Sequence, residues 1–456
     1  MKATTDGGFE GKSVEFDNER LLLEVPQKPL IFQGLFYFCA INTEQNILII
    51  GTVWPEPNSS AAGSRMMQLI ALFQKQNWKV TFASSASDSE FMVDLKAVRV
   101  DKVSIELNNA SFDEFVNQLN PDVVVFDRFM IEEQYGWRVA ENCPNALRII
   151  DTEDLHCLRY ARQQAFKEKR AFQSIDLIND YAKREIASIL RCDLALIISS
   201  YEMDLLKSFF KVDERLLHYI PFMLDPLPEQ DVREWKGFEE RKHFATIGNF
   251  LHEPNWNSVL YLKEEVWPLI RAVLPDAEMH VYGAYPSRKV FNLHQPKDGF
   301  LIKGRAENVK EVLSNARLCL APLRFGAGLK GKLIDAMKCG TPIVTTSIGS
   351  EAMHGNLDWS GLIADTPESI AGAAVKLYSD KLLWENKQKN IAPIINEVYN
   401  LNLLGESLIK KMKDLQMNIN VHRLKNFLGS VLMHHTLAST KYMSRWIELK
   451  NQITKS

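Results

Sequence analysis

Residues 324–344 are the most informative segment of this chain, and they read Arg324-Phe325-Gly326-Ala327-Gly328-Leu329-Lys330-Gly331-Lys332-Leu333-Ile334-Asp335-Ala336-Met337-Lys338-Cys339-Gly340-Thr341-Pro342-Ile343-Val344. The pattern predicts a glycine-rich turn after a short buried strand, then a helix and a second strand. Gly326, Gly328 and Gly331 allow a tight turn and a close approach of the backbone to a ligand. Lys330 and Lys332 place positive charge where a helix begins, although the helix dipole favours anions there. The segment therefore predicts a diphosphate site built from helix amides and two ammonium groups.

The same segment resembles the nucleotide-sugar site of glycosyltransferases with the two-domain GT-B fold, family 4 in particular. In that family a G-x-G-x-K-x-K turn leads into a helix with an acidic residue, followed by A-M-x-x-G-x-P-V-V-T-T. Asp335 stands at the acidic position, where the family usually carries Glu, and Ala327 stands where many members carry a second Glu. The chain is therefore similar to the subgroup with the Gly/Lys-rich version of the motif.

Composition narrows the class of protein. A length of 456 residues predicts two or three domains, and a net charge of −3 gives no general attraction to nucleic acid. The six cysteines are scattered, without a C-x-x-C pair or a His/Cys cluster, so we expect no structural metal. No apolar run reaches the roughly 18 to 20 residues that a membrane span requires.

Strand-like and helix-like segments alternate twice along the chain, which predicts two parallel sheets covered on both faces. The strands expected in the first half are 46–53, 78–83, 122–127, 147–151 and 193–199, and those in the second half are 243–247, 278–282, 299–302, 317–321 and 342–345. The proline-rich segment 219–228 separates the two halves and is the expected hinge. The predicted fold class is α/β with GT-B architecture, in which two Rossmann-like, doubly wound domains face each other across a cleft.

The sequence, together with the resemblance over roughly residues 45–415, predicts four parts of the chain. Residues 1–42 form an N-terminal extension of uncertain structure, and residues 43–225 form the Rossmann-like acceptor domain. Residues 226–415 form the Rossmann-like nucleotide-sugar domain. Residues 416–456 form C-terminal helices that pack back on the body.

Two loops of the first half follow strands and should face the cleft, because ligands of open parallel sheets bind beyond the carboxyl ends of the strands. The loop before the first helix offers Gly63 and Arg65 as contacts to the donor, with an ordinary loop and helix cap as the equal alternative. The loop after the fourth strand offers Asp154 and His156, and Arg159 would orient the carboxylate.

In the second half, Gly248 and Asn249 end a strand, and Gly283 ends the next one. The loop after Gly248 lacks the Arg and Lys that most family members use for the diphosphate, so Lys330 and Lys332 are expected to take over that role. Glu351 follows the last strand and could accept hydrogen bonds from ribose or sugar hydroxyls, with a plain surface glutamate as the equal alternative.

The predicted function is transfer of a sugar from a nucleotide-sugar donor to a glycan or glycolipid acceptor. The resemblance to the family implies that the anomeric configuration of the sugar is retained. The expected catalytic residues are His156, Asp154, Lys330 and Asp335. The expected donor-binding residues are Gly63, Arg65, Gly248, Asn249, Gly283, Gly326, Gly328, Lys330, Lys332, Asp335 and Glu351. The alternatives are a nucleotide-sugar epimerase and a non-catalytic sugar-nucleotide-binding or scaffold protein in polysaccharide assembly.

The expected partners are the nucleotide-sugar donor and a glycan or lipid-linked acceptor, without nucleic acid, metal or cofactor. A cytoplasmic location at the inner face of the cytoplasmic membrane fits such an acceptor. Peripheral membrane contact stays open, because no strongly basic amphipathic patch is evident in the sequence.

Overall fold

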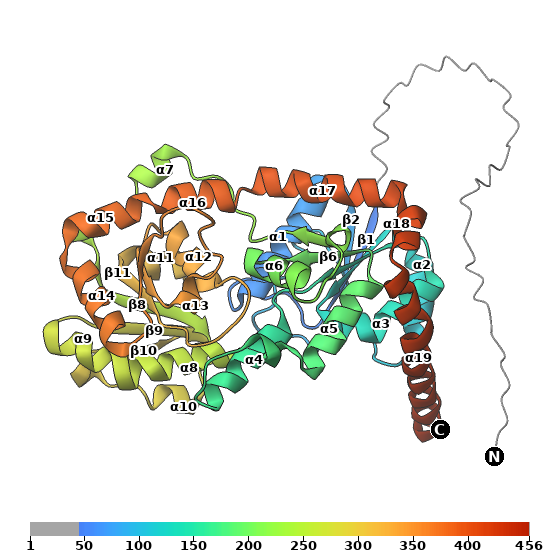
Figure 1. Ribbon diagram of the computed structural model, residues 1–456, viewed down its shortest axis with the longest axis horizontal. Helices are drawn as coiled ribbons and strands as arrows, with labels where there is room; N and C mark the ends of the chain where they lie inside the picture. Colours follow the sequence, from blue (N-terminus) through green and yellow to red (C-terminus); the bar gives the residue numbers. More distant parts are fainter. Residues whose placement is uncertain (1–44, 456) are drawn as a thin grey trace, which may run out of the picture. The chain divides into compact units, whose positions relative to one another are not determined.

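The computed structural model describes residues 45–455 of the chain. The N-terminal extension expected over residues 1–42 lies outside the described residues. The rest forms one unit with two parallel sheets, and Figure 1 shows these sheets side by side with helices around each. The predicted α/β class with GT-B architecture is confirmed.

The first domain has a sheet of seven parallel strands in the order β3-β2-β1-β4-β5-β6-β7. The strands are β1 (Asn46–Gly51), β2 (Lys79–Ser84), β3 (Asp101–Ser104), β4 (Val123–Asp127), β5 (Leu147–Asp151), β6 (Leu194–Ile197) and β7 (Leu217–Tyr219). The helices are α1 (Ala61–Lys75), α2 (Ser111–Leu119), α3 (Phe129–Asn142), α4 (His156–Lys167), α5 (Asp180–Arg191) and α6 (Ser200–Ser208).

Both faces of this sheet are buried, as the continuous apolar strands require. In β1, Ile47 and Ile49 point into one core, and Leu48 and Ile50 point into the other. Successive side chains of a strand point to opposite faces, so an unbroken apolar run fills two cores. The central strands are thereby fixed, and the loops at their carboxyl ends are held in place.

The second domain has a sheet of six parallel strands in the order β10-β9-β8-β11-β12-β13. The strands are β8 (Lys242–Asn249), β9 (Met279–Ala284), β10 (Phe300–Gly304), β11 (Ala316–Ala321), β12 (Ile343–Thr345) and β13 (Gly361–Ile363). The helices are α7 (Glu229–Arg233), α8 (Glu253–Tyr261), α9 (Trp267–Val273), α10 (Arg288–Phe291), α11 (Val309–Asn315), α12 (Gly331–Lys338), α13 (Ser347–Ser350), α14 (Pro367–Ser379), α15 (Lys381–Lys389) and α16 (Ile391–Val398).

The chain passes between the domains twice, and the two passages lie side by side. The backbone N–H of Leu224 donates to the carbonyl of Tyr399 at 2.7 Å, and the N–H of Leu401 donates to the carbonyl of Leu224 at 2.8 Å. The first passage is the proline-rich segment expected between the halves. The covalent connection between the domains therefore consists of two adjacent chain segments, which are hydrogen-bonded to each other.

The C-terminal helices are α17 (Leu401–Met417), α18 (Ile419–Lys425) and α19 (Phe427–Lys455). Helix α17 buries Leu408, Met412 and Leu415 in the core behind β1 of the first domain. Residues 401–415, assigned from the sequence to the second domain, therefore pack on the first. Helix α19 continues along α3 and α5. Across residues 45–455, no helix has both the length and the apolar composition needed to cross a membrane.

Candidate functional site

A cavity of about 1240 Å³ lies between the two sheets. Its lining comes from segments that follow strands of both domains: Arg128 after β4, Glu153 after β5, Asn249 and Ala284 at the ends of β8 and β9, and Leu323 after β11. The site is therefore where parallel sheets present their ligand-binding loops.

Two helix N-termini meet at this cavity, one from each domain. Helix α1 begins at Ala61, and the hydroxyl of Ser60 accepts the N–H of Gly63 at 3.0 Å as its cap. Helix α12 begins at Gly331, and a Cβ on this glycine would lie 2.4 Å from the Cβ of Ala61. Only a glycine allows this approach. The free amides and positive dipole ends of both helices converge there, which favours an anion.

Lys330 and Lys332 add two ammonium groups to this position. The Lys330 Nζ donates to the carbonyl of Gly328 at 2.5 Å, and the Lys332 Nζ lies beside Gly248. In the described part of the chain, neither lysine forms an ion pair with a carboxylate. Burial lowers the pKa of Lys332 to about 8, so most of it is still charged at neutral pH. An anionic ligand would relieve this uncompensated charge.

The glycine-rich turn has a conformation that other residues adopt with difficulty. Gly328 has φ +61°, and a Cβ on it would lie 2.8 Å from the Cβ of Asp154 in the first domain. Gly326 has φ +152° and lines the cavity as well. The turn therefore packs directly against the loop after β5, and glycine is required at Gly328 for both backbone and space.

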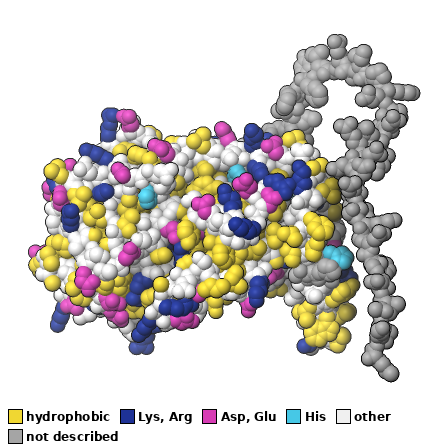
Figure 2. Space-filling model, in the orientation of Figure 1, with side chains coloured by type: hydrophobic (Ala, Val, Ile, Leu, Met, Phe, Trp, Pro, Cys, Tyr) yellow, Lys and Arg dark blue, Asp and Glu magenta, His cyan; other side chains and the backbone are white. Residues whose placement is uncertain are grey.

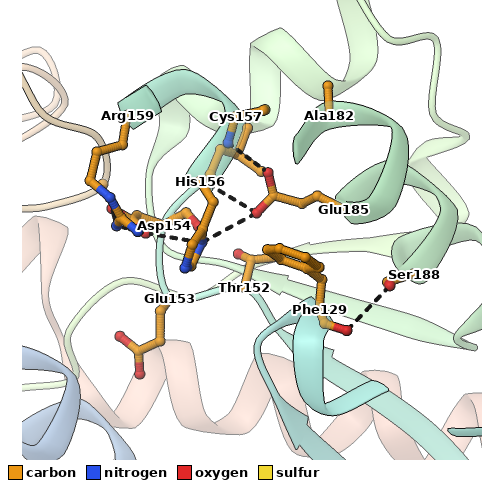
Figure 3. Close-up of polar contacts among 12 residues, drawn as sticks. Phe129, Thr152, Glu153, Asp154, His156, Cys157, Arg159, Ala182, Glu185 and Ser188 are labelled. Carbon is orange, nitrogen blue, oxygen red and sulfur yellow. Dashed lines mark hydrogen bonds and ion pairs between the residues drawn. The ribbon is translucent and has the colours of Figure 1, made fainter. Parts of the chain in front are cut away.

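Asp154, His156 and Arg159 form one cluster at the start of α4 (Figure 3). Arg159 forms an ion pair with Asp154, and the His156 Nδ1 lies 3.2 Å from the carbonyl of Asp154. Burial raises the pKa of Asp154, but Arg159 and then His156 and His252 hold it well below its usual range. Asp154 is therefore a permanent anion in the cavity wall.

Glu185 from α5 fixes the direction of α4. Its carboxylate accepts the backbone N–H of His156 at 3.0 Å and that of Cys157 at 3.1 Å. A carboxylate that accepts hydrogen bonds from the free N–H groups at a helix N-terminus also interacts favourably with the positive end of the helix dipole. The imidazole of His156 stacks edge-on to Phe129 at 5.3 Å between ring centroids, so its plane is set from both sides.

Two further residues of the cavity wall, Glu153 and Arg128, were not selected from the sequence. Both have left-handed backbones, with φ +62° for Glu153 and +72° for Arg128. Glu153 points away from the His156 cluster (Figure 3), is 9% exposed, and its Oε1 has no hydrogen-bond partner in residues 45–455. Burial, followed by the neighbouring Asp151, raises the pKa of Glu153 to about 8. Strained backbone of this kind concentrates at functional sites and could not be read from the sequence.

Three expected donor contacts do not line the cavity: Gly63, Arg65 and Glu351. Arg65 is fully buried, forms an ion pair with Asp151, and donates to the carbonyl of Ile220 at 2.9 Å. It neutralises a buried carboxylate below the site and does not reach a ligand. A Cβ on Gly63 would lie 2.5 Å from the backbone of Glu56, so this glycine serves the packing of α1 against its own loop.

Glu351 faces another protein residue. Its carboxylate accepts two hydrogen bonds from Arg162 of α4, at 2.7 and 2.8 Å. Arg162 also donates to the carbonyl of Gly326 at 2.9 Å. Glu351 thus joins the two domains beside the glycine-rich turn. Its oxygens are not available to a sugar hydroxyl, because the guanidinium of Arg162 already occupies both of them.

The remaining expected residues do line the cavity: Gly248, Asn249, Gly283, Gly326, Gly328, Lys330, Lys332, Asp335, Asp154 and His156. The second-domain members cluster at the ends of β8 and β9 and at α12. Burial raises the pKa of Asp335 on α12. His252 also lines the cavity. In the part of the chain that is described, no group of three His, Cys, Asp or Glu side chains could hold a metal ion.

Residues 241–380 match the family model described as glycosyl transferases group 1. No curated protein sequence matches the chain. Solved structures share the fold at low identity. Sucrose-phosphate synthase from Thermosynechococcus elongatus is 16% identical with a TM-score of 0.62, and the match covers 82% of this chain and 99% of that one.

Two further structures were solved with ligands. TarM from S. aureus, in a complex with fondaparinux, alpha-GlcNAc-glycerol and UDP, is 11% identical with a TM-score of 0.62, over 81% of this chain and 99% of that chain. HepE from Anabaena, in complex with UDP and glucose, is 12% identical with a TM-score of 0.61, over 81% of this chain and 100% of that chain.

Proposed function

Because residues 241–380 are a glycosyl transferases group 1 domain within a GT-B fold, we propose that this glycosyltransferase takes a nucleoside diphosphate sugar whose diphosphate binds between the N-termini of α1 and α12. One observation carries the proposal: the two helix N-termini meet at Ala61 and Gly331, with Lys330 and Lys332 at the same position. Amides, dipoles and ammonium groups together form a strong site for a diphosphate.

The rest of the donor follows from the position of the diphosphate. The nucleoside extends toward Gly248 and Gly283 at the ends of β8 and β9, and Asp335 offers a carboxyl to ribose. The sugar extends toward Asp154 and the first domain. All four residues line the same cavity, and its volume of about 1240 Å³ leaves room for an acceptor beside the donor.

Stabilisation of the leaving diphosphate supplies the chemistry in this proposal. Charge develops on the diphosphate as the glycosidic bond breaks, and donors already oriented by the fold stabilise it without reorganisation. Removal of one such donor typically lowers the rate about 10²-fold or more.

Retention of configuration is proposed because neither carboxyl of the loop after β5 suits an attack on the sugar. Asp154 is held in an ion pair by Arg159, and the raised pKa of Glu153 keeps this group protonated at neutral pH. The departing diphosphate can instead guide the acceptor hydroxyl to the face that it leaves. The proposed acceptor is a glycan or a lipid-linked glycan bound on the first-domain side of the cavity.

The test is the binding of UDP-, GDP-, ADP- and dTDP-glucose to the wild type and to the double variant Lys330→Ala/Lys332→Ala. One nucleotide class should raise Tm, and a ligand at about 100 times its Kd stabilises by about 2.7 kcal/mol. The double variant should lose this shift, whereas Lys376→Ala, an exposed lysine on α14, should keep it. If no nucleotide sugar binds the wild type, the donor proposal fails. Binding without turnover of any acceptor would favour the scaffold alternative.

A further inference from the structure

Over residues 441–453, helix α19 (Phe427–Lys455) presents its polar side to the protein and its apolar side outward. Ser444 is buried and accepts a hydrogen bond from Arg138 of α3 at 3.1 Å, and Ser444 donates to Asn108 at 2.9 Å. Glu448 and Lys441 lie on the same side and form ion pairs with Arg138 and Glu141. A helix that packs on a globular body normally does so through its apolar face.

The outward side of α19 carries an apolar stripe over residues 442–453. Tyr442, Trp446, Leu449 and Ile453 follow the four- and three-residue spacing of one helix face, and their exposed fractions lie between 58% and 75%. Phe427 and Val431 are also exposed, closer to the body, and their spacing places them on the same side of the helix. Figure 2 shows hydrophobic side chains covering the part of this helix that extends past the first domain. A contiguous exposed stripe of this size indicates an interaction site.

The charged residues of α18 and α19 are mostly positive, although Arg423 and Lys441 pair with Asp193 and Glu141 of the first domain. Helices α18 and α19 contain six Lys or Arg residues and one acidic residue, in a chain whose net charge is −3. Arg445 and Lys450 are exposed and stand on either edge of the stripe. The single acidic residue, Glu448, is engaged by Arg138.

This charge pattern distinguishes between two occupants of the stripe. A second copy of the chain would set the positive charges at the edges of the stripe against equal charges, and Glu448, the acidic residue of α18 and α19, is already paired with Arg138. An anionic bilayer surface compensates them, while lysine and arginine stems can reach the headgroups from the edge of an apolar face. Tryptophan and tyrosine favour the same interfacial depth.

We propose that α19 is a membrane-docking helix that inserts its stripe of Phe427, Val431, Tyr442, Trp446, Leu449 and Ile453 into the headgroup region of an anionic lipid surface. Because α19 packs on α3 and α5, the docking helix belongs to the first domain, on whose side we propose that the acceptor binds. The inference does not depend on sugar transfer, since docking needs neither donor nor acceptor.

The experiment is sedimentation of the full chain with vesicles of phosphatidylcholine alone or mixed with phosphatidylglycerol, at low and high salt. The wild type should bind the anionic vesicles and lose binding as salt rises. Trp446→Ser/Leu449→Ser should weaken binding at least about tenfold, since it removes two large apolar side chains from the stripe. Arg445→Glu/Lys450→Glu should weaken it by about fivefold for each positive charge removed.

The matched control is Leu382→Ser/Lys389→Glu on α15, where an exposed apolar residue and an exposed lysine lie in the second domain. This variant should bind vesicles like the wild type, and all three variants should keep the wild-type Tm. Absence of binding to anionic vesicles, or equal binding to uncharged ones, would overturn the proposal. A wild-type dimer that separates in Trp446→Ser/Leu449→Ser would overturn it too and assign the stripe to a second copy.

Discussion

At the scale of single residues, Glu202 of α6 links the two domains through one carboxyl oxygen. Its Oε1 accepts the backbone N–H of Leu155 at 2.9 Å and that of Gly328 at 2.9 Å. The side chain is fully buried, and burial, followed by the nearby Asp154, raises the pKa of Glu202 to about 8. A neutral Glu202 therefore connects the loop after β5 to the glycine-rich turn.

The raised pKa predicts a specific pH dependence of stability. Between the unfolded value of about 4.5 and the folded value of about 8, the folded protein binds more protons at Glu202 than the unfolded chain does. The contribution of Glu202 to stability is therefore complete below about pH 4.5 and is lost as pH rises toward 8. Tm measured from pH 5 to 8 should fall less steeply in Glu202→Gln than in the wild type.

The control for this prediction is Glu397→Gln, an exposed glutamate on α16. It should leave the slope of Tm against pH unchanged. Parallel slopes for the wild type and Glu202→Gln would show that Glu202 ionises normally in the folded protein, and the argument for a neutral bridge would be wrong.

At the scale of elements, the contact between α1 and α12 depends on one missing methyl group. A Cβ on Gly331 would lie 2.4 Å from the Cβ of Ala61, so Gly331→Ala must push the two helix N-termini apart. Overpacking of this kind costs about 1–3 kcal/mol. The proposed diphosphate site would widen, and titration calorimetry should show weaker binding of the nucleotide sugar together with a lower Tm.

Gly372 on α14 is the matched control, because no atom lies within 4 Å of a Cβ placed on it. Gly372→Ala should leave donor binding unchanged and stabilise the helix by about 0.5–1 kcal/mol, since alanine loses less backbone entropy than glycine. If Gly331→Ala binds the donor with unchanged affinity, the contact between α1 and α12 does not shape the diphosphate site.

At the scale of the whole molecule, side chains close the cleft at both sides of the cavity. Arg162 joins Glu351 and the carbonyl of Gly326 on one side. Tyr285 donates to Glu56 at 2.8 Å on the other, and the guanidinium of Arg305 lies over the ring of Phe91 at 4.1 Å. These contacts hold a closed arrangement, which in an enzyme excludes water from a reactive donor.

Arg162→Met should loosen this closure, since it leaves Glu351 and the turn at Gly326 without their donor. We expect faster hydrolysis of the donor in the absence of acceptor, and a larger radius of gyration in solution scattering. Arg184→Met removes an exposed ion pair to Glu133 within the first domain and should change neither quantity. Equal hydrolysis by the wild type and Arg162→Met would show that this bridge does not control water access.

The sequence by itself determined the periodic and local features of the protein. Buried strands such as β1 and β5 follow from unbroken apolar runs, and the turn at Gly328, the positive charges of α12 and the two-domain α/β class follow from local patterns. The edge strands β3, β7 and β13 were not predicted, because they are short and are partly exposed, so they lack a distinct apolar run.

Only the tertiary structure decided which charged side chains face the cavity. Arg65 and Asp151 are 86 positions apart, and Arg162 and Glu351 are 189 apart, so no local pattern shows that each pair is satisfied within the protein. The Glu153 Oε1, which has no hydrogen-bond partner among residues 45–455, and the outward apolar stripe of α19 emerge only once their neighbours are placed. Hydrophobic periodicity indicates which face of a helix or strand is buried. The partner of a charged side chain depends instead on how the two sheets and the terminal helices pack together.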